Sequence, residues 1–168
     1  MKLIQVNKLR YRKHLNRLIV ACIAAFVIGS LGIAQGLIAL FPSESGSHFH
    51  WNLTGVIITG FVITTLLNKY RRHDYMTEVV YVWELKQSLN KINRKLSKIK
   101  AAAQEGNVDA LIILHYSYAG SRLLWQLDDN TIIMDELALA QAELDSLAAK
   151  YLVELDANDY KPHMLKQF

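Results

Sequence analysis

The chain has a single cysteine, Cys22, and this scarcity excludes every structure that depends on paired thiols. One thiol forms neither a disulfide framework nor a cysteine-rich zinc site. Cys22 lies in an apolar run, where a thiol stays protonated and acts as a small packing residue. The cysteine content therefore predicts no redox or metal chemistry.

Motifs that carry catalysis are also missing from the sequence. There is no P-loop, no dinucleotide-binding glycine fingerprint, no HExxH and no GxSxG. His73 with Asp74, and Glu84, are isolated candidates without a third partner. We therefore expect a protein that is not an enzyme and that needs no cofactor.

Charge is absent from residues 18–41, an apolar run with two strongly polar side chains, Ser30 and Gln35. A bilayer core needs about 20 apolar residues in a helix, because no water is present there to satisfy a bare backbone. The run is longer than the apolar region of a secretory signal, which is roughly 7–15 residues. We therefore expect a permanent transmembrane helix.

A second apolar run, residues 51–68, lies near the lower length limit for a span. The connecting loop, residues 42–50, has no Lys or Arg, whereas basic residues lie beyond the other end of both runs. Basic residues beside a span are retained on the cytoplasmic side. The pattern predicts a two-helix transmembrane hairpin with both chain termini in the cytoplasm.

The basic residues beside the two runs are expected to contact the phospholipid membrane, where each contributes about 1 kcal/mol at an anionic surface. Residues 1–17, which contain no acid, form either an ordinary topology signal or a surface-lying amphipathic helix. The candidates for contact with anionic lipid are Arg10, Arg12, Lys13, Arg17, Lys69, Arg71 and Arg72.

Small residues form a stripe on the first span, within an arc of about 80° at 100° per residue. Small residues let two helix backbones approach in lipid, where packing drives association. The stripe favours either a homo-oligomer or packing on the second span, whose Gly55, Thr59, Gly60 and Thr64 do not share one face. Its members are Ala21, Ala25, Gly29, Gly32, Gly36 and Ala39.

Residues 69–158 are expected to form a cytoplasmic three-helix bundle, followed by a C-terminal tail at 159–168. Two helices with apolar residues in alternating steps of three and four flank one apolar helix, and such a/d seams are typical of coiled coils. Gly106 and Asn107 are predicted to end the first helix and cap the second. The seam residues are Val82, Leu85, Leu89, Ile92, Leu96 and Ile99, and then Ile133, Leu137, Ala140, Leu144, Leu147 and Tyr151. Because no helix breaker separates Leu67 from Glu84, one alternative is a second span that continues into the bundle.

Two groups of polar side chains are candidate ligand sites. His48 and His50 make a weak metal site, because two imidazoles and a nearby carboxylate are a poor ligand set, and we expect no metal. The basic face formed by Lys91, Arg94, Lys95 and Lys98 lacks stacking aromatics and a groove-reading motif, so we expect no nucleic-acid partner.

Several long runs resemble a gammaproteobacterial inner-membrane family that is classed only as a domain of unknown function. The runs are RYRKHLNR before the first span, then EVVYVWELKQSLNKINRKLSKIKAAAQEG, LDDNTI and DELALAQAELD. The resemblance implies an inner-membrane setting and supplies no activity, substrate or site residues.

The expected function is that of a membrane-anchored interaction protein, which self-associates and presents its cytoplasmic bundle to a partner. The alternatives are an accessory subunit of a transporter or channel, with another membrane protein as partner, or a small membrane enzyme.

Overall fold

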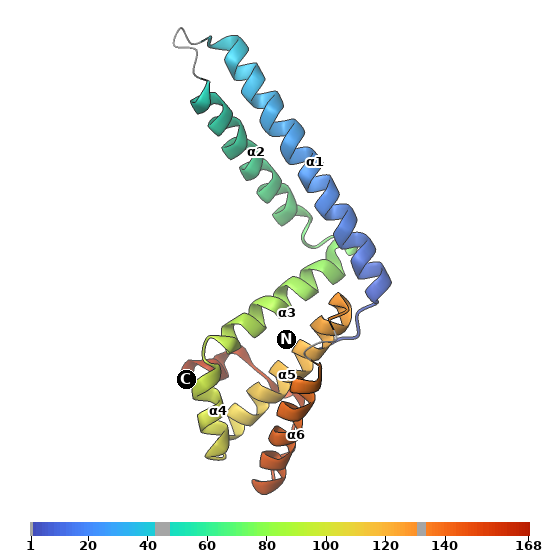
Figure 1. Cartoon of the computed structure of the whole chain (residues 1–168), viewed down its shortest axis with the longest axis vertical. Coiled ribbons are helices and arrows are strands. Elements are labelled where there is room, and N and C mark those ends of the chain that lie inside the picture. Colours follow the sequence, from blue (N-terminus) through green and yellow to red (C-terminus); the bar gives the residue numbers. More distant parts are fainter. Residues whose placement is uncertain (1, 43–47, 131–133) are drawn as a thin grey trace. The chain divides into compact units, whose positions relative to one another are not determined.

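The computed structural model describes residues 2–42, 48–130 and 134–168, and within these ranges all regular structure is helical (Figure 1). The all-α fold class is therefore confirmed. The α-helices are α1 (Lys8–Leu40), α2 (Phe49–Tyr70), α3 (Thr77–Asn93), α4 (Leu96–Gln104), α5 (Val108–Asp128) and α6 (Met134–Lys150). The 3₁₀ helices are η1 (Asp74–Met76), η2 (Ala157–Asp159) and η3 (Pro162–Gln167).

The chain divides into two compact units. The first, Leu9–Val80, is called the hairpin unit below. The second combines Met1–Lys8 with Tyr81–Phe168 and is called the bundle unit. The boundary expected at residue 69 is thus found within α3, and the first residues of the chain belong with the bundle. In this unit the Ile4 amide donates to the Tyr81 hydroxyl at 2.9 Å, and Lys8 forms an ion pair with Asp129.

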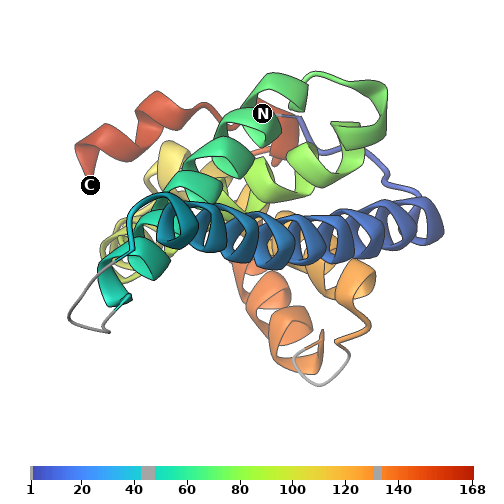
Figure 2. The same ribbon diagram turned by 90° about the horizontal axis from the view of Figure 1, so that it is seen from above.

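In the hairpin unit, α1 and α2 are both long and apolar enough to cross a membrane. They run alongside each other in Figure 1, and the view from above shows that they cross at an angle near their loop (Figure 2). Only 6% of the most apolar window of α1 and 11% of that of α2 is buried. A core helix of a soluble protein hides such a surface, whereas these two helices expose their Ile, Val, Leu and Phe side chains. The exposed apolar surface needs a covering of lipid or protein.

The start of α1 and the end of α2 differ from the expected boundaries. Helix α1 begins at Lys8 and runs without a break through Leu18, so no boundary at residue 17 separates two elements. Helix α2 ends at Tyr70, and the alternative of one helix continuing into the bundle is wrong. The chain turns because the His73 side chain accepts a hydrogen bond from the Tyr75 amide at 3.2 Å, which starts η1.

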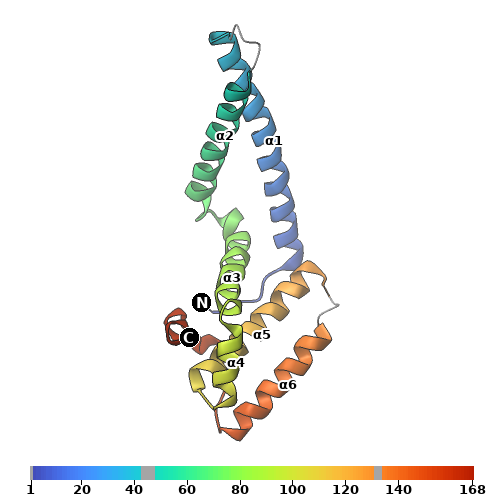
Figure 3. The same ribbon diagram turned by 60° about the vertical axis from the view of Figure 1, so that its left-hand side comes forward.

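In the bundle unit, α5 lies between α4 and α6 (Figure 3). Its position explains its composition, since a helix that is covered on several sides is apolar on several sides. The start of α5 is as the sequence predicts. Gly106 has φ +85° after α4, and the Asn107 side chain accepts from the Ala110 amide at 3.0 Å. The side chains of Leu85 and Leu89 lie close to Gly120. A Cβ atom added at Gly120 would lie only 3.2 Å from each of them.

The first seam of the bundle runs over two helices, α3 and α4, and not over the single helix expected. The break falls at Arg94 and Lys95, where the Lys95 amide donates to the Ile92 carbonyl at 2.9 Å. A straight α-helix drifts by about 20° per heptad from a 3.5-residue repeat. The break offsets this drift, because Ile92 before it and Ile99 after it are both fully buried.

The last ten residues, predicted from the sequence to be a tail, pack against the bundle unit. Tyr160 and Leu165 are buried, and both η2 and η3 contact α5. The Lys95 ammonium donates to the Leu165 carbonyl at 2.8 Å, and Lys98 donates to a Phe168 oxygen at 3.4 Å. Two members of the predicted basic face therefore bind the chain's own C-terminus.

Candidate functional site

The closest contact within the hairpin unit lies at the loop end of α1 and α2. A Cβ atom added at Gly55 would lie 2.5 Å from the Ser30 carbonyl oxygen and 3.1 Å from the Ala34 nitrogen. One added at Gly29 would lie 2.8 Å from Cγ2 of Thr59. Glycine at these two positions allows the two backbones to touch, as small residues do in membrane helix pairs.

The small-residue stripe of α1 is divided between three environments. Gly29 is in the contact with Thr59, and Ala21 and Ala25 line a cavity between the helices. Gly32 and Gly36 are exposed, and an added Cβ atom at either would meet nothing within 4 Å. Ala39 is exposed as well. The stripe is therefore not the surface on which α2 packs, apart from Gly29.

An open-sided cavity of about 470 Å³ lies between α1 and α2 at the end away from their loop. The two helices approach each other near the loop and diverge toward the other end (Figure 3). Its volume is within the range of about 300–1,000 Å³ that is typical of ligand pockets. Its walls are apolar and come from Leu18, Ala21, Cys22 and Ala25 of α1 and Ile63, Leu66 and Leu67 of α2. Tyr70, His73, Tyr75 and Met76 close its end.

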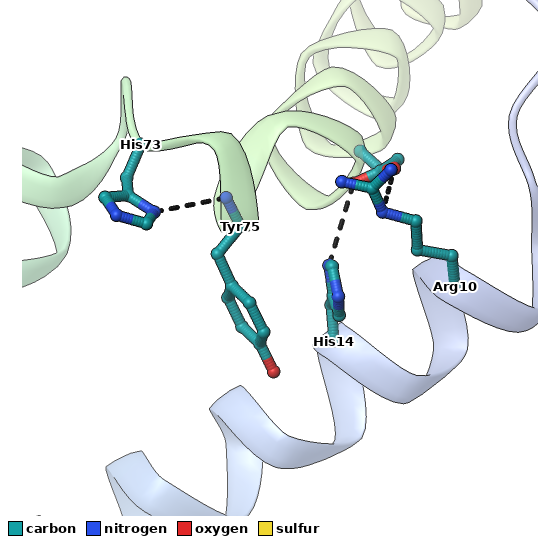
Figure 4. Close-up of polar contacts among 5 residues, drawn as sticks. Arg10, His14, His73 and Tyr75 are labelled. Atoms are coloured by element: carbon teal, nitrogen blue, oxygen red, sulfur yellow. Dashed lines mark hydrogen bonds and ion pairs between the residues drawn. The ribbon is translucent and has the colours of Figure 1, made fainter.

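A polar cluster beside the cavity joins α1 to η1 and the start of α3 (Figure 4). The His14 and Tyr75 rings stack with centroids 3.9 Å apart. Glu78 accepts from Arg10 Nε at 2.9 Å, and its second oxygen lies 3.7 Å from His14 Nδ1. The His14 and Glu78 side chains are only 14% and 16% exposed. This cluster, His14, Tyr75, Glu78 and Arg10, is called the brace below because it ties η1 and the start of α3 to α1.

The basic residues predicted to contact lipid differ in their surroundings. Arg10 belongs to the brace. Lys13, Arg17, Lys69, Arg71 and Arg72 are exposed, and Arg12 is half-buried. Arg17 directly precedes the cavity residue Leu18, while Lys69 and Arg72 flank the Tyr70–Arg71 pair at the end of α2. Several exposed cations therefore lie next to the apolar cavity in the sequence of the hairpin unit.

Both predicted seams face inward in the bundle unit. Val82, Leu85, Ile92, Ile99, Leu137 and Leu144 are buried, while Leu89, Leu96, Ala140, Leu147 and Tyr151 are half-buried. Ile133 lies outside the described residues. The seams are occupied within the chain, so the bundle unit does not present them to another molecule.

The predicted weak metal site has no support from a third ligand. Across residues 2–42, 48–130 and 134–168, no group of three His, Cys, Asp or Glu side chains is placed to hold a metal ion. Glu44, the carboxylate near His48 and His50 in the sequence, lies outside the described residues.

Two stacked tyrosines are buried in the bundle unit. The Tyr116 and Tyr160 rings stack with centroids 4.1 Å apart and an angle of 21°. Burial raises the pKa of both phenols. A phenol whose pKa is raised on folding binds its proton more tightly in the folded chain. Its contribution to stability is complete below the unfolded pKa of about 10 and is lost as pH rises through the folded pKa.

We therefore expect the bundle unit to lose stability as the pH rises above about 10, by up to about 1.4 kcal/mol per pH unit for each tyrosine. The variant with both Tyr116→Phe and Tyr160→Phe should show a flatter profile in urea unfolding followed by tryptophan fluorescence. Tyr70→Phe, which changes an exposed tyrosine, is the matched control and should leave the profile unchanged. Equal alkaline losses in the double variant and the unchanged protein would contradict this assignment.

Sequence reasoning did not single out the brace or the Gly55 contact. In the sequence, Gly55 and Thr59 belong to a set of four small residues of the second span that do not all share one face. As an i, i+4 pair they do share one, and both are buried. A signal for the brace existed in Glu78, an acid that follows a strongly basic stretch and therefore invites a basic partner.

Together these features define a class of protein, an all-helical chain with an apolar hairpin of membrane-spanning length and a separate helical bundle. The chain belongs to the family described as Protein of unknown function (DUF3087), whose model matches residues 1–165. No curated protein and no solved structure matches the chain.

Proposed function

We propose that the protein is a membrane-anchored interaction protein. In this proposal α1 and α2 cross the bacterial inner membrane, both termini lie in the cytoplasm, the chain self-associates, and the bundle unit is presented to a partner. The role is one of assembly and not of catalysis.

The observation that carries the proposal is the open face of α1 at Gly32 and Gly36. These glycines expose backbone, and no part of the described chain covers them. Two copies of a small-x-x-x-small face can pack closely on each other, since dispersion and backbone contacts drive helix association in lipid. A symmetric pair also uses the same patch on both chains, so one face suffices.

The charge distribution supports the topology. The basic residues lie at the start of α1 and after α2, on the side of the hairpin away from its loop. The loop contains no Lys or Arg. This asymmetry is the pattern by which short-looped proteins keep their basic ends in the cytoplasm.

The expected result for a variant with both Gly32→Ile and Gly36→Ile is loss of the dimer. Bulky side chains prevent the backbones from approaching, which removes the packing that stabilises a pair of helices in lipid. The measurement is amine cross-linking of the full chain in native membranes, followed by electrophoresis. Ala24→Ile adds a similar side chain to an exposed position of α1 outside the stripe, and it should leave the dimer intact.

Unchanged dimer yields in the double glycine variant would exclude this face of α1. The rival proposal, an accessory subunit of a transporter or channel, uses the same open face for another membrane protein. Purification in mild detergent with mass measurement separates the two, because a homo-oligomer has a multiple of the chain mass of 19.1 kDa. A monomer that copurifies with a transporter would favour the rival.

A further inference from the structure

We propose that the cavity between α1 and α2 binds an acyl chain of one anionic phospholipid of the cytoplasmic leaflet. The inference rests on the proposed membrane topology, and it adds a defined ligand site to it. The headgroup phosphate would lie at the basic residues that adjoin the cavity, chiefly Arg17, Lys69 and Arg72.

The shape and the apolar lining of the cavity favour the acyl chain of a lipid as the ligand. All seven wall residues from α1 and α2 are apolar or a thiol, so water in the cavity would lose hydrogen bonds. An apolar groove that is open along one side favours an apolar ligand over water. In the proposed topology Leu18–Ala25 and Ile63–Tyr70 are the halves of the spans nearest the cytoplasm. Acyl chains are the apolar molecules available at that depth.

The brace fixes the residues at one end of the cavity. The stack of Tyr75 on His14 and the ion pair of Arg10 with Glu78 fix η1 and the start of α3 against α1. Met76, which is buried, fills the space beneath them and closes the end of the cavity. The residues that form this end of the cavity are therefore held to α1, and the space between the two helices beyond them is open to a ligand.

The exposed basic residues beside the cavity favour a lipid with an anionic headgroup. Arg17, Lys69 and Arg72 are exposed within a few residues of the cavity walls. The described acids of the hairpin unit are Asp74 and Glu78, and Glu78 is already paired with Arg10. The remaining positive charge favours a phosphate diester with a neutral headgroup substituent, such as phosphatidylglycerol, over zwitterionic phosphatidylcholine.

The test uses the full chain in phosphatidylcholine vesicles that contain a small amount of photoactivatable lipid, with a diazirine in the acyl chain. Phosphatidylglycerol and phosphatidylcholine forms of this probe are compared. After illumination, mass spectrometry locates the adducts. We expect the phosphatidylglycerol probe to label peptides that contain the cavity walls, with a yield about tenfold above that of the phosphatidylcholine probe.

Two variants fill the cavity from opposite walls, Cys22→Phe on α1 and Ile63→Trp on α2. Each should reduce cavity adducts by about tenfold, since the added ring takes the volume of the chain. Ala24→Phe is the matched control, because Ala24 is exposed and is not a wall residue, and it should retain the adducts. The variant with Arg17→Gln and Arg72→Gln should retain chain labelling but lose the preference for phosphatidylglycerol.

Several outcomes would overturn the inference. Adducts spread evenly over both helices, or unchanged by both filling variants, exclude a defined site. Equal labelling by the two probes excludes selection of an anionic headgroup. Resistance to alkaline extraction and dimer cross-linking are measured on the same samples. If both are retained while cavity labelling is absent, the lipid site is wrong and the proposed function stands; if the chain is extracted, the topology itself is wrong.

Discussion

Replacement of Gly55 by leucine is expected to separate α1 from α2 at the loop end of the hairpin. The added Cβ atom would lie 2.5 Å from the Ser30 carbonyl oxygen and 3.1 Å from the Ala34 nitrogen. These are backbone atoms, so no side-chain rotation relieves the contact and the helices themselves must move. Overpacking of a fitted contact costs about 1–3 kcal/mol, and a backbone obstacle places this variant at the upper end of that range.

The separation is measured through a disulfide between Gly29→Cys and Thr59→Cys, in a chain that also carries Cys22→Ser. These two positions are in direct contact in the hairpin unit. Gly55→Leu should lower the yield of this disulfide on oxidation in membranes by about tenfold or more. Gly60→Leu is the matched control, since a Cβ atom there lies at an ordinary 3.8 Å from Phe26. Equal yields in the two variants would show that Gly55 is not the point of closest approach.

Truncation of Leu85 to alanine should destabilise the bundle unit by about 2–5 kcal/mol, the range for buried leucine side chains. Leu85 is fully buried and contacts the α5 backbone at Gly120, a position with no side chain that can move into the space. Leu139→Ala removes the same atoms from a side chain that is 68% exposed, and it should change stability by less than about 0.5 kcal/mol.

The measurement is urea unfolding of the full chain in detergent, followed by the fluorescence of Trp83 and Trp125 in a Trp51→Phe background. These two tryptophans belong to the bundle unit. A difference of less than about 1 kcal/mol between Leu85→Ala and Leu139→Ala would contradict the close contact of Leu85 with α5 at Gly120.

Much of this fold follows from the sequence because local rules govern it. Apolar runs of sufficient length predict the two helices of the hairpin. Steps of three and four place the seam residues, and the structure buries Leu85, Ile92 and Leu144 among them. Gly106 and Asn107 mark the junction of α4 and α5, because a left-handed residue followed by a side-chain cap is a local requirement.

Other features are set by partners that are distant in the sequence. The break between α3 and α4 contains neither glycine nor proline, so the sequence does not mark it. Its effect is seen only in the tertiary structure, where both Ile92 and Ile99 are buried in the bundle unit. The last residues carry no helical periodicity that would predict burial. They are held by Lys95 and Lys98, which the sequence presents as an ordinary basic face.

The sequence by itself determined that this protein has two helices of membrane-spanning length and an inward-facing set of seams, because periodicity and length depend on neighbours along one helix. Only the tertiary structure decided how the small-residue stripe is used. The stripe is a property of α1 alone, whereas its partner depends on the direction from which α2 approaches. That approach fixes Gly55 at the backbone of Ser30, leaves Gly32 and Gly36 open, and forms a cavity beside Ala21 and Ala25.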